Sequence, residues 1–253
     1  MLGAIAGDII GSRFEGQRAP PRDFTLFHPD CQFTDDSVCT LAVVDALLGD
    51  RDFAASLRSF TRRHPARGYG GMFLKWAFAD DAPAYGSWGN GAPMRVAAIG
   101  WLARDVAEAL ELAAAQAVVT HNHPDAVAGA QAVALAILLA RSGLSRGDLR
   151  QRLAADFGYD LTPARALAGG TFDVSAAGTV PPAITAVLEA NDWESAVRTA
   201  ICLGGDTDTL ACIAGAVAEA VHGLPRDIAD RSRDHLTPDL LAVVARFEAA
   251  IQS

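Results

Sequence analysis

The sequence predicts an all-α protein, and three observations favour that fold class. Apolar residues recur at helical spacing along most of the 253-residue chain. Hydrophobic residues make up 51% of the chain but aromatic residues only 7%, so alanine and leucine dominate and favour close helix packing. Alternating β patterns are scarce, and only residues 171–180 suit a short extended segment. We expect one compact domain, residues 1–253, of about a dozen helices.

Local start and stop signals place the helices in order along the chain. Ser145, with Asp148 three residues later, is typical of a helix start, and Gly143 and Gly223 are typical of helix ends. No linker rich in proline, serine or glycine divides the chain. The expected helices cover residues 1–12, 35–49, 51–63, 70–80, 93–104, 106–119, 124–142, 145–156, 181–190, 193–203, 206–222 and 237–251.

Charge and cysteine content narrow the class of protein. The formal net charge of −9 argues against a broad basic surface for nucleic acid. The four cysteines form no CxxC pair, and we expect them to be reduced. The N-terminus lacks the pattern of a signal peptide, and no apolar stretch is expected to span a bilayer. These features predict a soluble, cytoplasmic protein without a membrane partner.

Two short acidic runs stand at the starts of two apolar helices. The first is Thr34-Asp35-Asp36-Ser37, and the second is Gly204-Gly205-Asp206-Thr207-Asp208-Thr209. Carboxylates crowded into one helical turn repel one another unless a positive charge lies between them. Carboxylate and hydroxyl oxygens without nearby cysteine or histidine suit Mg²⁺, Mn²⁺ or Ca²⁺ rather than zinc. If the two turns meet, they predict a site for one or two hard divalent cations.

Helix capping is the alternative interpretation of either run alone. Asp, Ser and Thr are preferred at helix N-termini, where acidic groups also interact favourably with the helix dipole. A cap needs only one such side chain, however, and each run supplies three or four. The two runs together favour a metal site.

The N-terminal helix contributes two further acids. Gly3, Gly7 and Gly11 are spaced four residues apart, which permits very close contact with another helix. Asp8 would then face the interior and accept hydrogen bonds from metal-bound water or loop amides, unless it lies on a solvated outer face. Glu15 follows the expected end of this helix, where a mobile loop or simple solvation is compatible with the sequence.

Two glycine-rich loops and a pair of histidines complete the candidate residues. The loop at 67–71 precedes a helix and offers unhindered amides to an anion, although it is not a P-loop. In the loop at 87–95, Trp88 offers a face for stacking a base, unless it packs in the core, and Asn90 suits a left-handed turn. His121 and His123 are expected to cap a helix or contact phosphate rather than bind a metal.

These motifs, in this order, resemble those of the ADP-ribosylglycohydrolase family. The combination is specific and extends from the start of the chain almost to its end, whereas no single motif is specific. The matching segments are 3–15 (GAIAGDIIGSRFE), 33–37 (FTDDS), 67–70 (RGYG), 87–95 (SWGNGAPMR), 120–121 (TH) and 204–209 (GGDTDT). One departure is Ser37, where many relatives have threonine, and the chain is shorter than many relatives.

The resemblance implies an all-α orthogonal bundle with a centre of two divalent cations, Mg²⁺ in preference to Mn²⁺. It implies metal ligands at Thr34, Asp35, Asp36, Asp206, Asp208 and Thr209. It also implies contacts with the ADP-ribosyl group from Gly70, Gly71, Ser87, Trp88, Gly89, Asn90 and His121. Glu15 falls where some members carry a mobile glutamate that covers the metals.

The expected activity is hydrolysis of the C1″ glycosidic bond of an ADP-ribosylated protein or small conjugate, releasing ADP-ribose. We assign Asp36 first to orient or deprotonate the water, with Glu15 assisting proton transfer and Asp35 as a further catalytic carboxylate. An alternative is a catalytically silent ADP-ribose-binding or structural protein on the same fold, and a less favoured one is a two-metal phosphoesterase. The leaving group is not readable from these motifs, and no interface stripe is evident, so we expect a monomer.

Overall fold

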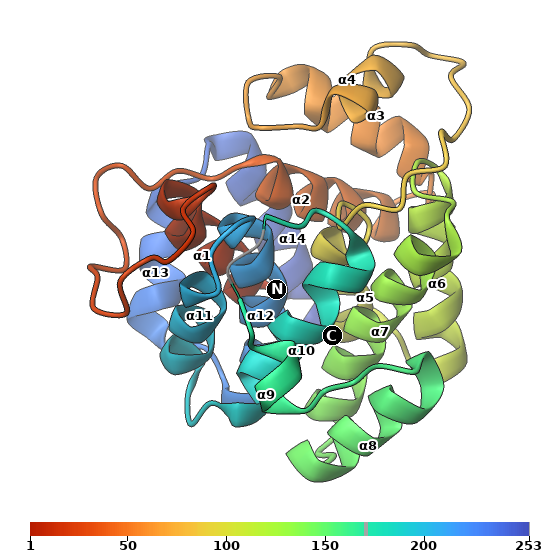
Figure 1. Ribbon diagram of the computed structural model, residues 1–253. Coiled ribbons are helices and arrows are strands. Elements are labelled where there is room, and N and C mark those ends of the chain that lie inside the picture. The colour runs from red at the N-terminus through yellow and green to blue at the C-terminus, as the bar shows by residue number, and fades with distance from the viewer. Residues whose placement is uncertain (170–171, 253) are drawn as a thin grey trace.

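The computed structural model describes residues 1–169 and 172–252. Among these residues, extended backbone pairing is confined to one isolated bridge between Gly89 and Ser175, which confirms the all-α class (Figure 1). The helices, in chain order, are α1 (Leu2–Gly11), η1 (Ser12–Phe14), α2 (Asp35–Leu47), α3 (Phe53–Arg63), α4 (Gly71–Ala77), η2 (Pro93–Arg95), α5 (Ala97–Leu102), α6 (Val106–Val118), α7 (Pro124–Arg141), α8 (Arg146–Phe157), α9 (Pro163–Ala166), α10 (Ala176–Glu189), α11 (Trp193–Cys202), α12 (Thr207–His222), α13 (Arg226–Asp234) and α14 (Pro238–Gln252), where η marks a 3-10 helix.

Helix α12 is the central helix of the fold. It packs against α1, α7, α10 and α11, and every residue from Thr207 to Ala218 is buried. Figure 1 shows α1 and α12 side by side in the middle of the molecule. The second acidic run therefore begins a helix that is enclosed on several sides.

The close approach of α1 and α12 depends on the three glycines of α1. A Cβ atom added at Gly3, Gly7 or Gly11 would overlap the backbone of α12. All residues of α1 are buried, so the whole circumference of this helix is in contact with protein. The four-residue glycine spacing thus predicted this close packing correctly.

Helices α3 and α4 form a separate projection on one side of the helical body. They pack against each other, and α3 also packs against α2 (Figure 1). Segment 64–70 joins α3 to α4, and segment 78–92 connects α4 with η2 in the body. Both segments contribute residues to the cavity described below.

Several expected helix boundaries differ from the structure. The helix predicted at 93–104 is divided at Val96 into η2 and α5, and next to this break the Met94 carbonyl accepts hydrogen bonds from Thr40 and Cys212 on neighbouring helices. The helix predicted at 70–80 ends at Ala77. Sequence reasoning missed α9, and it missed α13 because Ile228 and Ser232 are the buried residues of an otherwise polar helix.

The short extended segment expected within 171–180 is present at residues 172–175, where Ser175 forms the bridge with Gly89, and the rest of the stretch is helical. Helix α10 begins at Ala176 and contains Pro181 and Pro182, whereas we expected the helix to begin at the first proline. Prolines remove backbone donors and disfavour a helix interior. Here Val180 and Ala183 to Leu188 are buried, and this burial outweighs the local cost. Residue 171 itself lies outside the described residues.

The structure bears on two expectations, one about membrane-spanning segments and one about the cysteines. We expected no segment able to span a bilayer, yet α7 has the necessary length and apolar composition, with 18 residues. However, 56% of it is buried inside the protein, as in the core helix of a soluble protein. All four cysteines are free, and Cys202 is partly exposed while the other three are buried.

Candidate functional site

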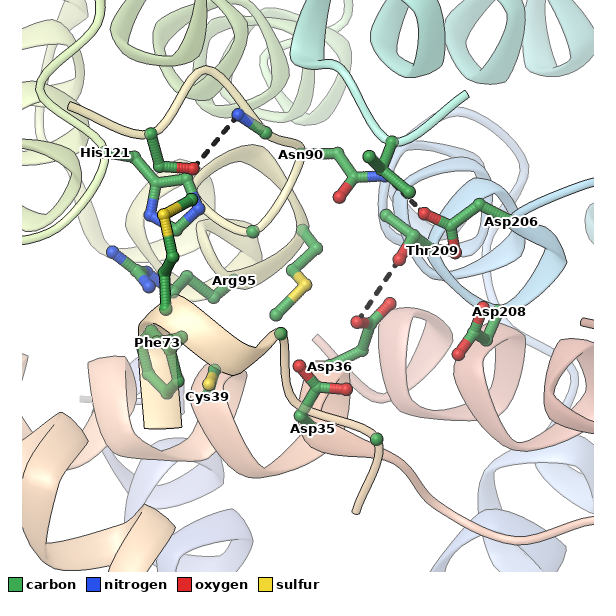
Figure 2. A pocket seen from close by; sticks show the side chains of 18 of the residues that line it. Asp35, Asp36, Cys39, Phe73, Asn90, Arg95, His121, Asp206, Asp208 and Thr209 are labelled. Carbon is green, nitrogen blue, oxygen red and sulfur yellow. Dashed lines mark hydrogen bonds between the residues drawn. The ribbon is translucent and has the colours of Figure 1, made fainter. Parts of the chain in front are cut away.

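The two acidic runs meet at the starts of α2 and α12. The Thr209 hydroxyl donates a hydrogen bond to Oδ1 of Asp36 at 3.4 Å, although 173 positions separate the two residues. Asp35, Asp36, Asp206, Asp208 and Thr209 all line one cavity of about 360 Å³. Figure 2 shows these side chains converging from the two helices. The sequence-based expectation that the two turns converge is therefore correct.

Capping explains only a small part of the acidic runs. At α2 the Thr34 oxygen accepts a hydrogen bond from the Asp36 amide at 3.2 Å, so Thr34 is the cap and the two aspartates are not. At α12 no side chain caps the first turn. Thr34 is not among the residues that line the cavity, and its hydroxyl donates to Oδ1 of Asp8 at 2.6 Å. One lone pair of this hydroxyl oxygen remains for a cation.

Asp8 holds the first acidic turn in place. Its carboxylate, fully buried in α1, accepts hydrogen bonds from the Thr34 amide at 3.0 Å and the Ser37 amide at 3.1 Å, and also from both hydroxyls. Burial raises the pKa of Asp8 to about 6, while these hydrogen bonds act in the opposite direction. The predicted contact with loop amides is confirmed, and the alternative of a solvated Asp8 is wrong.

Two carboxylate oxygens in the cluster lack hydrogen-bond donors. Asp36 Oδ2 and Asp208 Oδ1 are buried and have no partner among the described residues. Burial, followed by the charge of Asp208, raises the pKa of Asp36 well above its usual range. Burial and then Asp206 do the same for Asp208, and burial and then Asp8 for the partly buried Asp35. Buried acceptors with repelling charges are the arrangement that a bound cation stabilises.

Glu15 adds a fifth carboxylate to this cluster from the end of η1. One oxygen each of Glu15, Asp206 and Asp208 lie within 4.8 Å of one another. Glu15 is exposed, and partial burial together with the charge of Asp206 raises its pKa. It thus lies beside the cluster on the solvent side, where it can contact both a ligand and water.

Asn90 bonds to the acidic cluster rather than adopting a left-handed turn. Its side-chain amide donates to Oδ2 of Asp206 at 2.6 Å and to the Thr179 hydroxyl at 3.1 Å. Among the described residues, Arg51 is the single non-glycine residue with a positive φ, so the left-handed interpretation of Asn90 is wrong. Asn90 lines the cavity, and its amide donors orient a carboxylate there.

Trp88 lies at the mouth of the cavity, not in the core. Its side chain is 51% exposed, which excludes the alternative of ordinary core packing. Hydrogen bonds from the Asn90 amide to the Val174 carbonyl and from the Ala176 amide to the Trp88 carbonyl bring residues 172–176 alongside this loop. As a result Phe172, 58% exposed, joins the lining. Sequence reasoning missed Phe172, and no motif marks it.

The remaining predicted binding residues also line the cavity. Gly70 and Gly71 are exposed, and a Cβ at either would meet no atom within 4 Å, so their backbone is open to a ligand. The Ser87 hydroxyl accepts a hydrogen bond from the Gly89 amide at 3.2 Å. His121 is buried and faces this loop. His123 instead caps α7 by accepting from the Asp125 amide, as expected.

The cavity therefore has two chemically different ends, visible on opposite sides of Figure 2. We call the cluster of Glu15, Asp35, Asp36, Asp206, Asp208 and Thr209 the acidic end. We call the group of Gly70, Gly71, Ser87, Arg95 and His121 the donor end. Arg95 is fully buried, and its Nη1 has no partner among the described residues. Sequence reasoning quoted Arg95 within a motif but gave it no role.

Comparisons with known proteins identify the family of this chain. ADP-ribosylhydrolase ARH3 of Gallus gallus is 28% identical, with 88% of this chain and 84% of that protein covered. ARH3 of Danio rerio is 26% identical over an alignment of 302 positions, with 88% and 82% covered. A solved structure described as an ADP-ribosylglycohydrolase-related protein complex superimposes with a TM-score of 0.75 at 26% identity, covering 99% of this chain and 95% of that one. A model of ADP-ribosylglycohydrolase matches residues 1–253, and the chain therefore belongs to the ADP-ribosylglycohydrolase family.

Proposed function

We propose that this protein is a metal-dependent hydrolase that cleaves the C1″ bond of ADP-ribosylated substrates and releases ADP-ribose. The observation that carries the proposal is the pair of buried, unpartnered carboxylate oxygens of Asp36 and Asp208, which lie at one end of a cavity with an aromatic mouth. The ADP-ribosylhydrolase function named for the ARH3 relatives supports it. A cation can be held at one end while a nucleotide occupies the other.

The oxygen atoms of the acidic end suit hard divalent cations as ligands. Its available groups are carboxylate and hydroxyl oxygens, which suit both Mg²⁺ and Mn²⁺, and we propose Mg²⁺ in preference to Mn²⁺. The residues that would hold two such cations are Thr34, Asp35, Asp36, Asp206, Asp208 and Thr209. When bound, the cations would supply Lewis acidity toward the ribose hydroxyls and water. Asn90 and Asp8 would keep the ligand carboxylates oriented on either side.

The donor end and the cavity mouth fit the remainder of the ligand. The open amides of Gly70 and Gly71, with Ser87, Gly89 and His121, suit the oxygens of a diphosphate. Trp88 and Phe172 offer exposed faces to the adenine ring. A ligand that spans the cavity in this direction brings its distal ribose to the acidic end.

The reaction then proceeds by attack of water at C1″. Asp36 orients the water and accepts its proton, while a new C–O bond forms at C1″ and the bond to the leaving atom breaks. Carboxylates at the acidic end, including Asp35, stabilise the positive charge that develops on the ribose. Glu15, beside Asp206 and open to solvent, starts protonated and donates this proton to the leaving atom; solvent then takes the proton from Asp36 and reprotonates Glu15.

Hydrolysis assays on three substrates test this proposal. Arginine-linked, serine-linked and O-acetyl ADP-ribose are each incubated with the protein after EDTA treatment, and again after Mg²⁺ or Mn²⁺ is restored. We expect ADP-ribose release from at least one substrate, with activity lost in EDTA and regained with metal. Phosphate release is measured in parallel and is expected to stay at background.

Two outcomes would contradict the proposal. Unchanged hydrolysis in EDTA would exclude metal dependence, and phosphate release would indicate a phosphoesterase. Binding of ADP-ribose and metal without turnover of any of the three substrates would instead support the catalytically silent alternative.

A further inference from the structure

Thr120 forms a hydrogen-bonded link between Arg95 and His121 at the donor end. The Arg95 Nη2 donates to the Thr120 hydroxyl oxygen at 3.0 Å, and the same oxygen lies 2.7 Å from Nδ1 of His121. The Thr120 side chain is fully buried, and His121 is 6% exposed. The link therefore lies out of reach of bulk water.

The direction of each hydrogen bond in this link follows from the donors available. A guanidinium can only donate, so the Thr120 oxygen is the acceptor from Arg95. Among the described residues, the Thr120 hydroxyl hydrogen has no acceptor other than His121 Nδ1. If Nδ1 carried a hydrogen itself, this buried hydroxyl would have nowhere to donate, which folded proteins avoid.

The arginine that starts the link is held rigidly. Its Nε donates to the Gln116 side-chain oxygen at 2.6 Å, and Nη2 also donates to the Gln116 carbonyl at 2.8 Å. The Gln116 amide in turn donates to the Ala92 and Ala113 carbonyls. Arg95 has no carboxylate partner in the described part of the chain, so its positive charge is not neutralised there.

We propose that Arg95 and Thr120 are positioning residues that fix His121 as the tautomer with its hydrogen on Nε2, so that His121 donates this N–H to an anionic oxygen of the ligand. The Nε2 atom faces the glycine loop, where a Cβ at Gly91 would lie 2.8 Å from it. No hydrogen-bond acceptor for Nε2 is present among the described residues, and His121 lines the cavity. The identification of that oxygen with the diphosphate of ADP-ribose rests on the proposed function.

The groups around His121 favour the neutral form of its ring. Burial, followed by the positive charge of Arg95, lowers the pKa of His121 to about 3. The other titratable group facing the ring is Tyr85, whose ring centre lies 6.0 Å away and whose pKa burial raises to about 12. Arg95 Nη1, buried and unpartnered on the cavity wall, places positive charge near the same oxygen.

NMR of the histidine rings tests the tautomer directly. The full-length protein is labelled with ¹⁵N-histidine, and the His121 signals are identified by their loss in His121→Gln. We expect the Nε2–H tautomer between pH 5.5 and 8 in the wild type. Thr120→Val, which removes the hydroxyl and keeps the shape, should release the ring to a mixture of tautomers, whereas Thr120→Ser should restore the wild-type signature. An Nδ1–H or doubly protonated ring in the wild type would overturn the proposal, and this measurement requires no variant of Thr120 to fold.

Ligand affinity separates this inference from the proposed function. In Thr120→Val, shown by its melting temperature to be folded, we expect ADP-ribose to bind about tenfold more weakly. Adenosine, which has no phosphate, should bind the variant and the wild type equally, and equal loss of both ligands would contradict a role toward the anion. Failure of the wild type to bind ADP-ribose would refute the proposed function while the ring signature still decides the tautomer.

Discussion

The two ends of the cavity have opposite unsatisfied hydrogen-bonding groups. At the acidic end, Asp36 Oδ2 and Asp208 Oδ1 are acceptors without donors. At the donor end, Arg95 Nη1 is a donor without an acceptor. Buried polar groups without partners are rare in folded proteins, and a bound ion or ligand is one explanation for those that line a cavity. The comparison indicates a cation at one end and an anionic group at the other.

The two ends also differ in how they are held. At the acidic end, Asp8 and Asn90 fix carboxylates that repel one another, so folding maintains an unfavourable charge cluster. At the donor end, Arg95 is held by hydrogen bonds to the uncharged side chains of Gln116 and Thr120. Loss of a residue should therefore affect chemistry and stability in opposite directions at the acidic end, and mainly ligand affinity at the donor end.

The largest effect is expected from removal of a charge at the acidic end. Asp36→Asn and Asp208→Asn should each lower kcat by about 10²–10³-fold, because a metal ligand is lost. Without metal, each variant should be at least as stable as the wild type, because a buried repelling charge is removed. Thermal melting in EDTA and steady-state hydrolysis measure the two effects, with the exposed Asp81→Asn as the control. A fall in both activity and metal-free stability would contradict the claim that the acidic end holds carboxylates that repel one another.

The pH dependence of metal-free stability should follow the raised pKa values of Asp8 and of the acidic end beside it. Burial raises the pKa of Asp8 from 3.8 to about 6, so the folded state binds this proton more tightly than the unfolded state. Stabilisation is then complete below about pH 4 and is lost as the pH rises through 6, with about 3 kcal/mol from Asp8 alone. Denaturant unfolding in EDTA from pH 4.5 to 8 measures the slope, which Mg²⁺ should reduce. A stability that rises with pH over this range would contradict the account.

Asn90 should act through the acidic end although its loop belongs to the ligand-binding motifs. Because it donates to Asp206 Oδ2, Asn90→Ala should weaken Mn²⁺ binding by roughly 10–100-fold. Isothermal titration with Mn²⁺, and separately with ADP-ribose, distinguishes the two roles, with the exposed Asn191→Ala as a matched control. If ADP-ribose affinity fell while Mn²⁺ affinity stayed unchanged, the direct substrate contact expected from sequence would be the better description.

Trp88→Ala should have the smallest effect, at the cavity mouth. Loss of a stacking face should raise the Kd for ADP-ribose about tenfold and leave Mn²⁺ affinity unchanged. Phe78→Ala removes an equally exposed aromatic residue outside the cavity and serves as the control. An equal loss in both variants would mean that the effect does not depend on the cavity.

The acidic end was predictable from the sequence because the residues that mark it are close together in the chain. Each acidic run carries more carboxylates than a helix cap can use, and the glycines at 3, 7 and 11 indicate the close packing that brings α1 and α12 together. The prolines at 181 and 182 misled the prediction of α10, because a local rule was outweighed by burial of the helix face. The capping hydroxyl of Thr34 was likewise visible, but not its bond to Asp8.

The donor end was less predictable because its key contacts join distant segments. The Arg95–Thr120 hydrogen bond connects η2 with the residues before α7, and no spacing in the sequence indicates it. Phe172 reaches the cavity mouth only because residues 172–176 pair with the loop around Trp88. A side chain whose role depends on such a pairing can be assigned only after the fold is known.

Anomalous diffraction from crystals soaked in Mn²⁺ most directly tests the claim that the two acidic turns form one cation site. The account predicts anomalous density between Asp36 and Asp208, within coordination distance of the two oxygens that lack partners, and loss of that density in Asp208→Asn. Crystals that bind Mn²⁺ elsewhere, or that show no density between these two carboxylates, would contradict it.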